Sequence, residues 1–348
     1  MKSVPVKVAL AVVIGLVLVA SNLAAMSPDR NDSSQQQQPK PRPPADQDRP
    51  PAGQDDTPLR IGTDLVVLDV TVVDQSNKPI MDLSQDKFQV FEDKVPQKIE
   101  FFTKEQVPVS LVFAIDTSGS MRSKLETVIK ASTNLIRETK QGDEIAVIEF
   151  KEEPVLLEEF TTDVNDAIYA LEGMVARSQT AMLDALYLAA EYGHKEGKNR
   201  RKAVIVVTDG EDKDSQYQMK EVIEHLQELD VQVYLIGFTN DLDKSGGWVF
   251  SKSPKEKAEN LLNKLALETG GRAFFPRELS EVHTIAQQIS ADLRAQYSIG
   301  YYPSNSKRDG TFRTVRVQVE GGPRKLVART RNGYTSPREN EQPNTVNR

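Results

Sequence analysis

The stretch between residues 107 and 295 alternates apolar runs with segments that have apolar residues at helical spacing. The runs at 108–115 and 203–208 are almost wholly apolar, as expected of strands that are covered on both faces. The segment 124–139 has apolar residues every three or four positions, which is typical of an amphipathic helix. This alternation predicts parallel βα units. The fold class is therefore α/β, with a Rossmann-like, doubly wound, mostly parallel sheet.

Shorter segments with the pattern of strands flank this domain on both sides. The part 59–106 contains a β-branched run at 65–73, and the part 296–335 contains a cleanly alternating run at 312–319. Neither flank has enough strands to close a core by itself. We therefore expect the two flanks to pack together as one small antiparallel β module, with the domain 107–295 inserted into it.

The first 26 residues have the features of an export signal. Lys2 and Lys7 accompany an uninterrupted apolar run at 8–20, the pattern of a basic region followed by a hydrophobic core. This run is shorter than the roughly 20 residues of a membrane span, although it reaches that length if it continues to Met26. A cleaved signal peptide and an uncleaved membrane anchor therefore both remain open. Either one predicts an exported protein, periplasmic, secreted or anchored to the membrane.

The segment 27–58 has the composition of a disordered linker. It is rich in Pro and Gln and has almost no apolar residues, so burial cannot compensate for the entropy of ordering it. We expect an extended spacer here, and a second disordered segment at 336–348.

The overall composition excludes several classes of function. The 44 basic and 51 acidic residues give a net charge of −7, which argues against nucleic acid as a partner. The chain has no Cys and only three scattered His, so disulfides, thiolate zinc sites and histidine metal centres are not expected. Any metal site would have to be built from oxygen ligands.

Polar side chains follow two of the predicted strands. Asp116, Ser118 and Ser120 come directly after the first strand in a D-x-S-x-S pattern, Asp209 follows the strand 203–208, and Thr180 precedes a predicted helix. Ligands of open α/β sheets bind outside the carboxyl ends of the strands, so these groups should meet there. Two carboxylates and three hydroxyls suit Mg²⁺ or Mn²⁺, with Ca²⁺ as a further candidate. A coordination position left to water could then take a carboxylate from a partner.

This set of residues resembles the metal-ion-dependent adhesion site of von Willebrand factor type A domains, and the resemblance covers residues 107–293. In that family the two serines and the threonine bind the metal directly or through water, and the aspartates ligate it or hold its waters. The flanks, at 83–102 and 297–334, resemble those of bacterial exported proteins related to this family, common in acidobacteria. The resemblance implies metal-dependent protein binding, by adhesion or assembly in the cell envelope, with an acidic residue of the protein ligand completing the site.

Enzyme motifs are missing at the same positions. The third position of a D-x-D phosphoryl-transfer motif beginning at Asp116 holds Ser118 instead of an aspartate, and Ser118 also interrupts an Asp-Thr-Gly protease motif. No G-x-S-x-G and no phosphate-binding G-x-x-x-x-G-K-[ST] occurs. We therefore expect no catalytic activity. A structural scaffold with a loop-stabilising metal and, beyond that, a secreted hydrolase remain the alternatives.

One aromatic segment is a candidate for contacting the partner. It spans 240–253, follows the predicted strand 231–238, and holds Trp248, the only tryptophan, and Phe250. Because it leaves the sheet at the carboxyl end, these two side chains could form a hot spot beside the metal.

Overall fold

The computed structural model describes residues 65–104, 106–177, 179–244, 253–278, 280–322 and 325–339. The predicted export signal 1–26 and linker 27–58 lie outside the described residues, as do Trp248, Phe250 and most of the tail 336–348. Within the described ranges, no helix is both long and apolar enough to cross a membrane.

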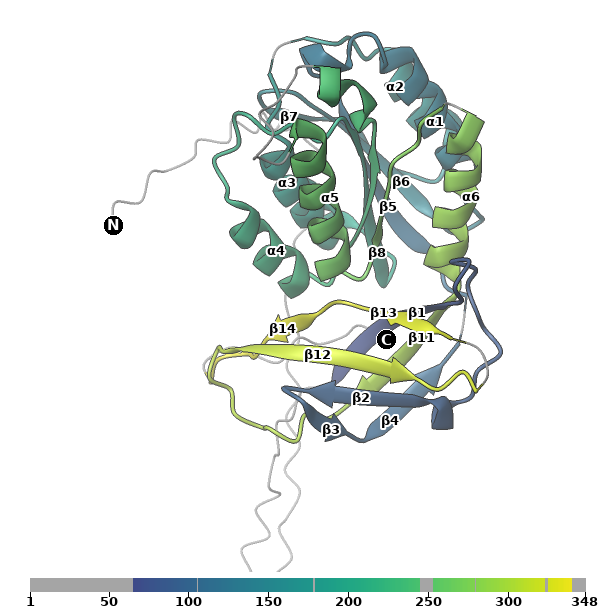
Figure 1. Cartoon of the computed structure of the whole chain (residues 1–348), viewed down its shortest axis with the longest axis vertical. Coiled ribbons are helices and arrows are strands. Elements are labelled where there is room, and N and C mark those ends of the chain that lie inside the picture. Colours follow the sequence, from purple (N-terminus) through teal and green to yellow (C-terminus); the bar gives the residue numbers. More distant parts are fainter. Residues whose placement is uncertain are drawn as a thin grey trace, which may run out of the picture. The chain divides into compact units, whose positions relative to one another are not determined.

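A six-stranded sheet forms the centre of the α/β domain (Figure 1). Its order is β10-β9-β8-β5-β6-β7, and only the edge strand β7 runs antiparallel to its neighbour. The predicted mostly parallel sheet is thus confirmed. The strands are β5 (Val109–Asp116), β6 (Glu144–Phe150), β7 (Pro154–Thr161), β8 (Arg201–Thr208), β9 (Gln232–Gly237) and β10 (Arg272–Phe274).

Helices cover both faces of this sheet, which makes it doubly wound (Figure 1). Along β5, Leu111 and Phe113 pack on one face, whereas Val112 and Ala114 pack on the other. Burial on both sides explains why the strand is almost wholly apolar. The first face is covered by α1 (Leu125–Arg137), α2 (Val164–Glu172) and α6 (Ser280–Arg294), and the second by α3 (Met182–Glu196), α4 (Met219–Glu228) and α5 (Pro254–Glu268).

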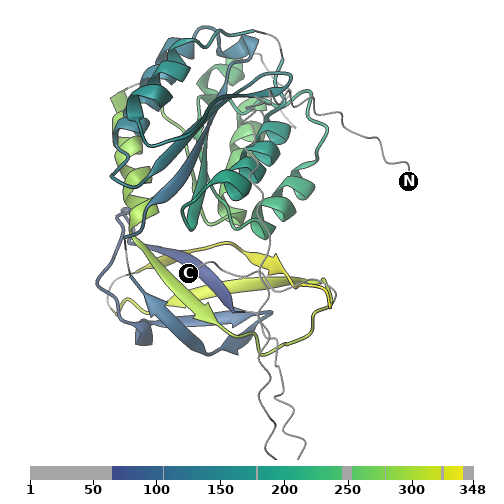
Figure 2. The ribbon, with the colours of Figure 1, turned by 180° about the vertical axis from the view of Figure 1, so that it is seen from behind.

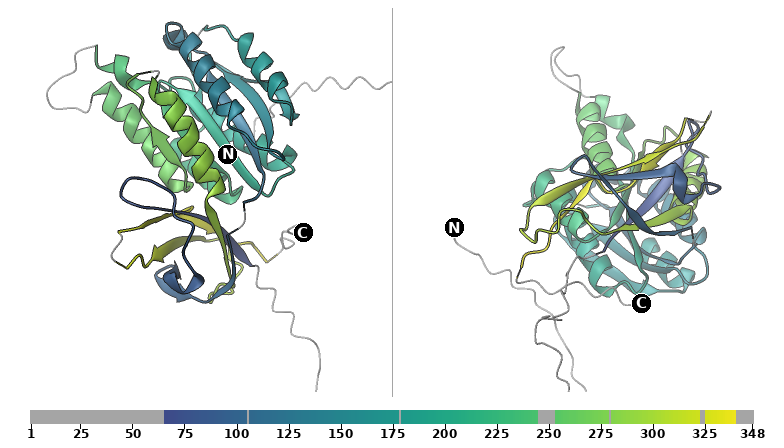
Figure 3. Two further views of the ribbon diagram at one scale, coloured as in Figure 1. Left: turned by 90° about the vertical axis from the view of Figure 1, so that its right-hand side faces the viewer. Right: turned by 90° about the horizontal axis from the view of Figure 1, so that it is seen from below.

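The flanking strands form two antiparallel four-stranded sheets, of order β13-β1-β11-β4 and β14-β12-β2-β3. Each sheet combines strands from before and after the α/β domain, which Figures 2 and 3 show as blue and yellow strands side by side. The core between them includes Leu68, Phe88, Tyr297 and Val317. The β module built from both flanks is therefore present. Its strands are β1 (Val66–Val73), β2 (Phe88–Glu92), β3 (Val95–Gln97), β4 (Ile99–Thr103), β11 (Gln296–Tyr301), β12 (Phe312–Val319), β13 (Val327–Arg329) and β14 (Gly333–Thr335).

Two elements after β6 were not predicted from the sequence, namely β7 and α2. β7 is a partly exposed edge strand with an irregular register against β6, so its side chains do not alternate between buried and exposed. The start of α2 did carry a usable signal, because the side chain of Asp163 accepts a hydrogen bond from the Asn165 amide as an N-cap.

The amino ends of the central strands adjoin the β module. Arg201, the first residue of β8, donates hydrogen bonds to Gln296 O (3.4 Å) and Ser298 Oγ (3.4 Å) of β11. Arg200 forms an ion pair of 3.0 Å with Asp69 of β1. The carboxyl ends of the strands, where the candidate site lies, are therefore at the opposite edge of the sheet.

Candidate metal centre

Three loops at the carboxyl ends of the strands carry the five predicted ligands. Asp116 is the last residue of β5, and Ser118 and Ser120 follow it in a turn that contains a short 3₁₀ helix (Gly119–Met121). Asp209 comes directly after β8, and Thr180 stands two residues before α3.

Backbone hydrogen bonds hold these loops against one another. The Arg177 amide donates to Thr117 O (2.8 Å), which joins the threonine loop to the loop after β5. The amides of Lys213 and Asp214 donate to Thr180 O at 3.1 and 3.2 Å, which joins the threonine loop to the loop after Asp209. The structure thus brings all three loops together, as the sequence predicted.

Asp116 is fully buried and is held by two hydrogen bonds. Its Oδ1 accepts from the Ser118 amide (2.9 Å), and its Oδ2 accepts from Thr208 Oγ1 (2.7 Å). Burial raises the pKa of Asp116 to about 6, and the charge of Asp209 adds to this, while the hydrogen bonds from Ser118 and Thr208 act in the opposite direction. The carboxylate is therefore placed where its negative charge is poorly compensated by the protein.

Thr208 is a member of the site that the sequence analysis missed. Its hydroxyl donates to Asp116 and accepts from the Gly210 amide (3.0 Å), so it links the loop after β5 to the loop after β8. The only signal in the sequence is a threonine immediately before Asp209, and a threonine at that position is also typical of an ordinary strand end.

The three predicted hydroxyl ligands differ in their surroundings. Ser120 is exposed, and its Oγ lies 3.1 Å from Ser118 Oγ. Thr180 is buried, and its Oγ1 has no hydrogen-bond partner in the part of the chain that the structure describes. A buried hydroxyl without a partner loses its hydrogen bonds to water on folding and gains nothing in exchange. Thr180 is thus an oxygen that a bound cation would satisfy.

Asp212 and Ser215 fix the start of α3 and so the position of the threonine loop. Asp212 Oδ1 accepts from the Met182 amide (2.9 Å), and Ser215 Oγ accepts from the Leu183 amide (3.0 Å). Both residues follow Asp209 in the same loop. That loop therefore holds the backbone next to Thr180 in place and also supplies a carboxylate.

The donor set fits a hard divalent cation. Neither Asp116 nor Asp209 forms an ion pair with any residue that the structure describes, and the remaining donors are neutral hydroxyls. Oxygen-only sets of this kind suit Mg²⁺, Mn²⁺ or Ca²⁺. In the described part of the chain there is no group of three or more His, Cys, Asp or Glu with metal-binding geometry. The candidate centre depends instead on two carboxylates and three hydroxyls.

The described part of the chain thus contains a Rossmann-like α/β domain with hydroxyl and carboxylate groups at the carboxyl ends of β5 and β8. The family model of the von Willebrand factor type A domain matches residues 110–288, just over half of the 348 residues. The chain belongs to this family, which confirms the resemblance seen in the sequence. Domains of this family are generally protein-interaction modules, so the chain carries a protein-interaction domain.

Solved structures with a similar fold include three bacterial proteins. An aerotolerance-related membrane protein from Bacteroides fragilis is 20% identical, with 52% of this chain and 98% of that chain covered and a TM-score of 0.43. BatB from Bacteroides thetaiotaomicron is 23% identical, with 52% and 97% covered and a TM-score of 0.41. A von Willebrand factor type A protein from Catenulispora acidiphila is 14% identical, with 82% and 77% covered and a TM-score of 0.43. The comparison with curated proteins returned no match.

Proposed function

We propose that the domain binds a divalent cation and uses it to capture a protein partner. The cation is Mg²⁺ or Mn²⁺, with Ca²⁺ as the alternative, and its ligands are Asp116, Ser118, Ser120, Thr180 and Asp209. The observation that carries the proposal is the buried hydroxyl of Thr180, which has no partner among the described residues although its loop is bonded to the loop of Asp209. Two carboxylates without an ionic partner and one unsatisfied oxygen are what a cation would complete.

The partner contributes a carboxylate. Mg²⁺ favours octahedral oxygen coordination and keeps water where the protein leaves positions empty. Since Ser120 is exposed, the site is open to solvent on that side, and an Asp or Glu of another protein can approach there. This is recognition without a chemical step, so we propose a binding protein and not an enzyme.

The place of action is the cell envelope. This part of the proposal depends on the sequence, in which a basic start and an apolar run at 8–20 precede the Pro-rich segment 27–58. An exported domain on an extended stalk would reach partners at some distance from the membrane, whether the signal is cleaved or kept as an anchor.

Cation-dependent stability and capture test this proposal with Asp116→Ala. The control is Glu126→Gln, which changes an exposed carboxylate on α1. In the wild type and in the control, Mg²⁺ at about 100 times its Kd should raise the free energy of unfolding by about 2.7 kcal/mol over the value in chelator. Asp116→Ala should show no such gain. In pull-downs from the envelope fraction of the source cells, the partner should be retained only with Mg²⁺ and only by the first two proteins.

Two other results would decide against parts of the proposal. Stabilisation by Mg²⁺ with equal capture in chelator would reject metal-dependent adhesion and support the scaffold alternative. Identical unfolding with Mg²⁺ and with chelator in the wild type would reject the metal centre itself.

A further inference from the structure

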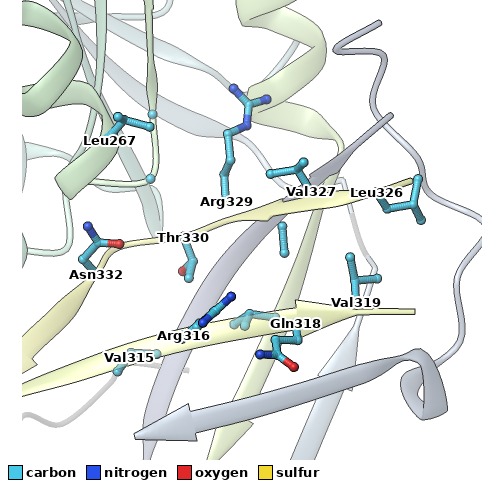
Figure 4. A pocket seen from close by; sticks show the side chains of 14 residues that line it. Leu267, Val315, Arg316, Gln318, Val319, Leu326, Val327, Arg329, Thr330 and Asn332 are labelled. Carbon is cyan, nitrogen blue, oxygen red and sulfur yellow. The ribbon is translucent and has the colours of Figure 1, made fainter. Parts of the chain in front are cut away.

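A cavity of about 670 Å³ lies where β12 and β13 of the β module diverge (Figure 4). It is bounded by residues 315–319 on one side, by residues 326–330 on the other, and by Leu267, Gly270 and Gly271 from the end of α5. Its volume lies within the range of about 300–1,000 Å³ that is common for binding sites. The cavity is far from the metal centre, since β13 belongs to the module at the amino ends of the central strands.

The second half of β12 has a free edge toward this cavity. β14 pairs only with Phe312–Thr314, and the Val315 amide makes the last bond on that side, to Asn332 O (2.8 Å). On the β2 side, the Glu320 amide donates to Lys87 O (2.8 Å), so residues 316, 318 and 320 direct their backbone groups to β2. By the alternation of an antiparallel ladder, the N–H and C=O groups of Val317 and Val319 point to the open side.

β13 presents a second free edge, because it is the outermost strand of its sheet. Val72 of β1 lies opposite Ala328, and the carbonyl of Val72 is used by the Ile80 amide (2.8 Å) on the far side of β1. The pair of Val72 and Ala328 therefore makes no ladder hydrogen bonds, and the N–H and C=O of Ala328 point away from β1. Two strand edges with unpaired backbone groups thus bound one cavity.

The residues that line the cavity indicate which side chains a bound ligand would need. Val327 and Leu267 are 51% and 60% exposed at the rim, so together they offer apolar surface that an apolar occupant would cover. Thr330 lines the cavity and is 8% exposed, and no described residue forms a hydrogen bond with its Oγ1. Figure 4 shows Thr330 on the side of its strand that faces β12.

The charge on the lining is positive. Arg329 is already paired with Asp292 (2.9 Å), whereas Arg316 is exposed and has no ionic partner among the described residues. No acidic residue lines the cavity. An occupant with a carboxylate would complement Arg316.

We propose that this cavity binds an extended peptide segment of a partner protein by strand addition. The backbone of the segment pairs with Val317 and Val319 on one side and with Ala328 on the other, and its apolar side chains cover Val327 and Leu267. Thr330 supplies one further hydrogen bond, and an Asp or Glu of the segment pairs with Arg316. Strand addition obtains affinity from main-chain hydrogen bonds and specificity from alternate side chains, which matches the two features found here.

Peptide binding to the full chain tests this proposal. The probe is a fluorescein-labelled, end-blocked peptide TVTVDVT, with TVTVKVT as its charge-reversed control, and binding is read by fluorescence anisotropy. Thr330→Val should weaken binding of the acidic peptide by up to about tenfold, since it removes one hydrogen bond but keeps the shape. Arg316→Gln should remove the preference for the acidic peptide over the basic one. Asp116→Ala and chelator should leave both affinities unchanged, which separates this site from the metal centre.

Backbone pairing has its own readout, which needs no variant. Amide hydrogen exchange of Val317, Val319 and Ala328 should slow in the complex, whereas the amide of Gln318, already in the ladder with β2, should not change. Val319→Pro, which removes an amide pointing to the cavity, should abolish binding. Absence of saturable binding, or unchanged exchange at all three amides, would overturn the proposal. So would a concentration-dependent dimer in sedimentation that Val319→Pro abolishes, since a second copy would then occupy the edge.

Discussion

The two ends of the six-stranded sheet both collect buried polar residues, but the protein satisfies them in opposite ways. At the amino end, two buried aspartates each meet an arginine: Asp143 pairs with Arg294, and Asp292 with Arg329. At the carboxyl end, Asp116 and Asp209 meet only hydrogen-bond donors. They have no ionic partner among the described residues.

This difference separates the contact between the α/β domain and the β module, called the joint below, from a binding site. At the amino end, ion pairs and hydrogen bonds connect the α/β domain to the β module: Arg200 pairs with Asp69 of β1, Asp292 pairs with Arg329 of β13, and Arg201 donates to Gln296 O of β11. The carboxyl end keeps two desolvated carboxylates and the orphan hydroxyl of Thr180 in fixed positions, at a cost in free energy that a cation would offset. The aspartates at one end of the sheet are therefore paired with arginines, whereas those at the other end are available to a cation.

The largest effect on the free energy of unfolding is expected when an ion pair at the amino end of the sheet is removed. Asp143 accepts from the amides of Val109 (3.0 Å) and Lys140 (2.8 Å) and pairs with Arg294, and its side chain is completely buried. Asp143→Ala leaves the largely buried Arg294 without its partner, so it should lower the free energy of unfolding by about 3–5 kcal/mol. Urea unfolding in chelator measures this.

The matched change at the other end is Asp116→Ala, also a buried aspartate. It removes an uncompensated charge, so in chelator it should cost far less than Asp143→Ala. Equal losses for the two variants would show that both ends serve stability alike, and the distinction between joint and site would be wrong.

An intermediate effect is expected at Thr208, which positions Asp116 within the proposed metal centre. Thr208→Val removes the 2.7 Å hydrogen bond to the carboxylate while keeping a similar shape. Loss of a hydrogen bond to a charged group costs about 1.5 kcal/mol, so Mg²⁺ should bind about tenfold more weakly in titration calorimetry. Thr208→Ser keeps the hydroxyl and should restore most of the affinity. If both variants bind Mg²⁺ as the wild type does, Thr208 has no positioning role.

The features that could be predicted from the sequence are those written in local patterns. The central strands were evident because burial on both faces leaves runs such as 203–208 apolar. Four of the five candidate ligands could be proposed because they follow strand ends, and Thr180 because its loop leads into a helix at the same edge of the sheet. The edge strand β7 was not, since its register against β6 is irregular and no alternation remains.

Long-range pairs were beyond local patterns. Arg200 and Asp69 are 131 positions apart and pair only because β11 and β1 lie against the start of β8. Thr208 was missed for a related reason: a threonine at a strand end is ordinary, and its role follows from the position of Asp116, 92 residues earlier. Sequence patterns thus locate the donors of the site, while the groups that hold the donors require the fold.

The smallest expected effect is a pH dependence of stability, which tests the same comparison between the two ends of the sheet. The pKa of Asp116 is raised to about 6 from an ordinary value of 3.8, so its ionised form destabilises the folded state at pH above 6. This penalty is relieved as the pH falls through 6. In chelator the wild type should therefore gain about 1 kcal/mol of unfolding free energy between pH 7.5 and 5, relative to Asp116→Asn. In Mg²⁺ the trend should reverse, because protons compete with the cation for the same carboxylate. An identical pH dependence of the two proteins in chelator would mean that the charge of Asp116 is compensated within the apo fold.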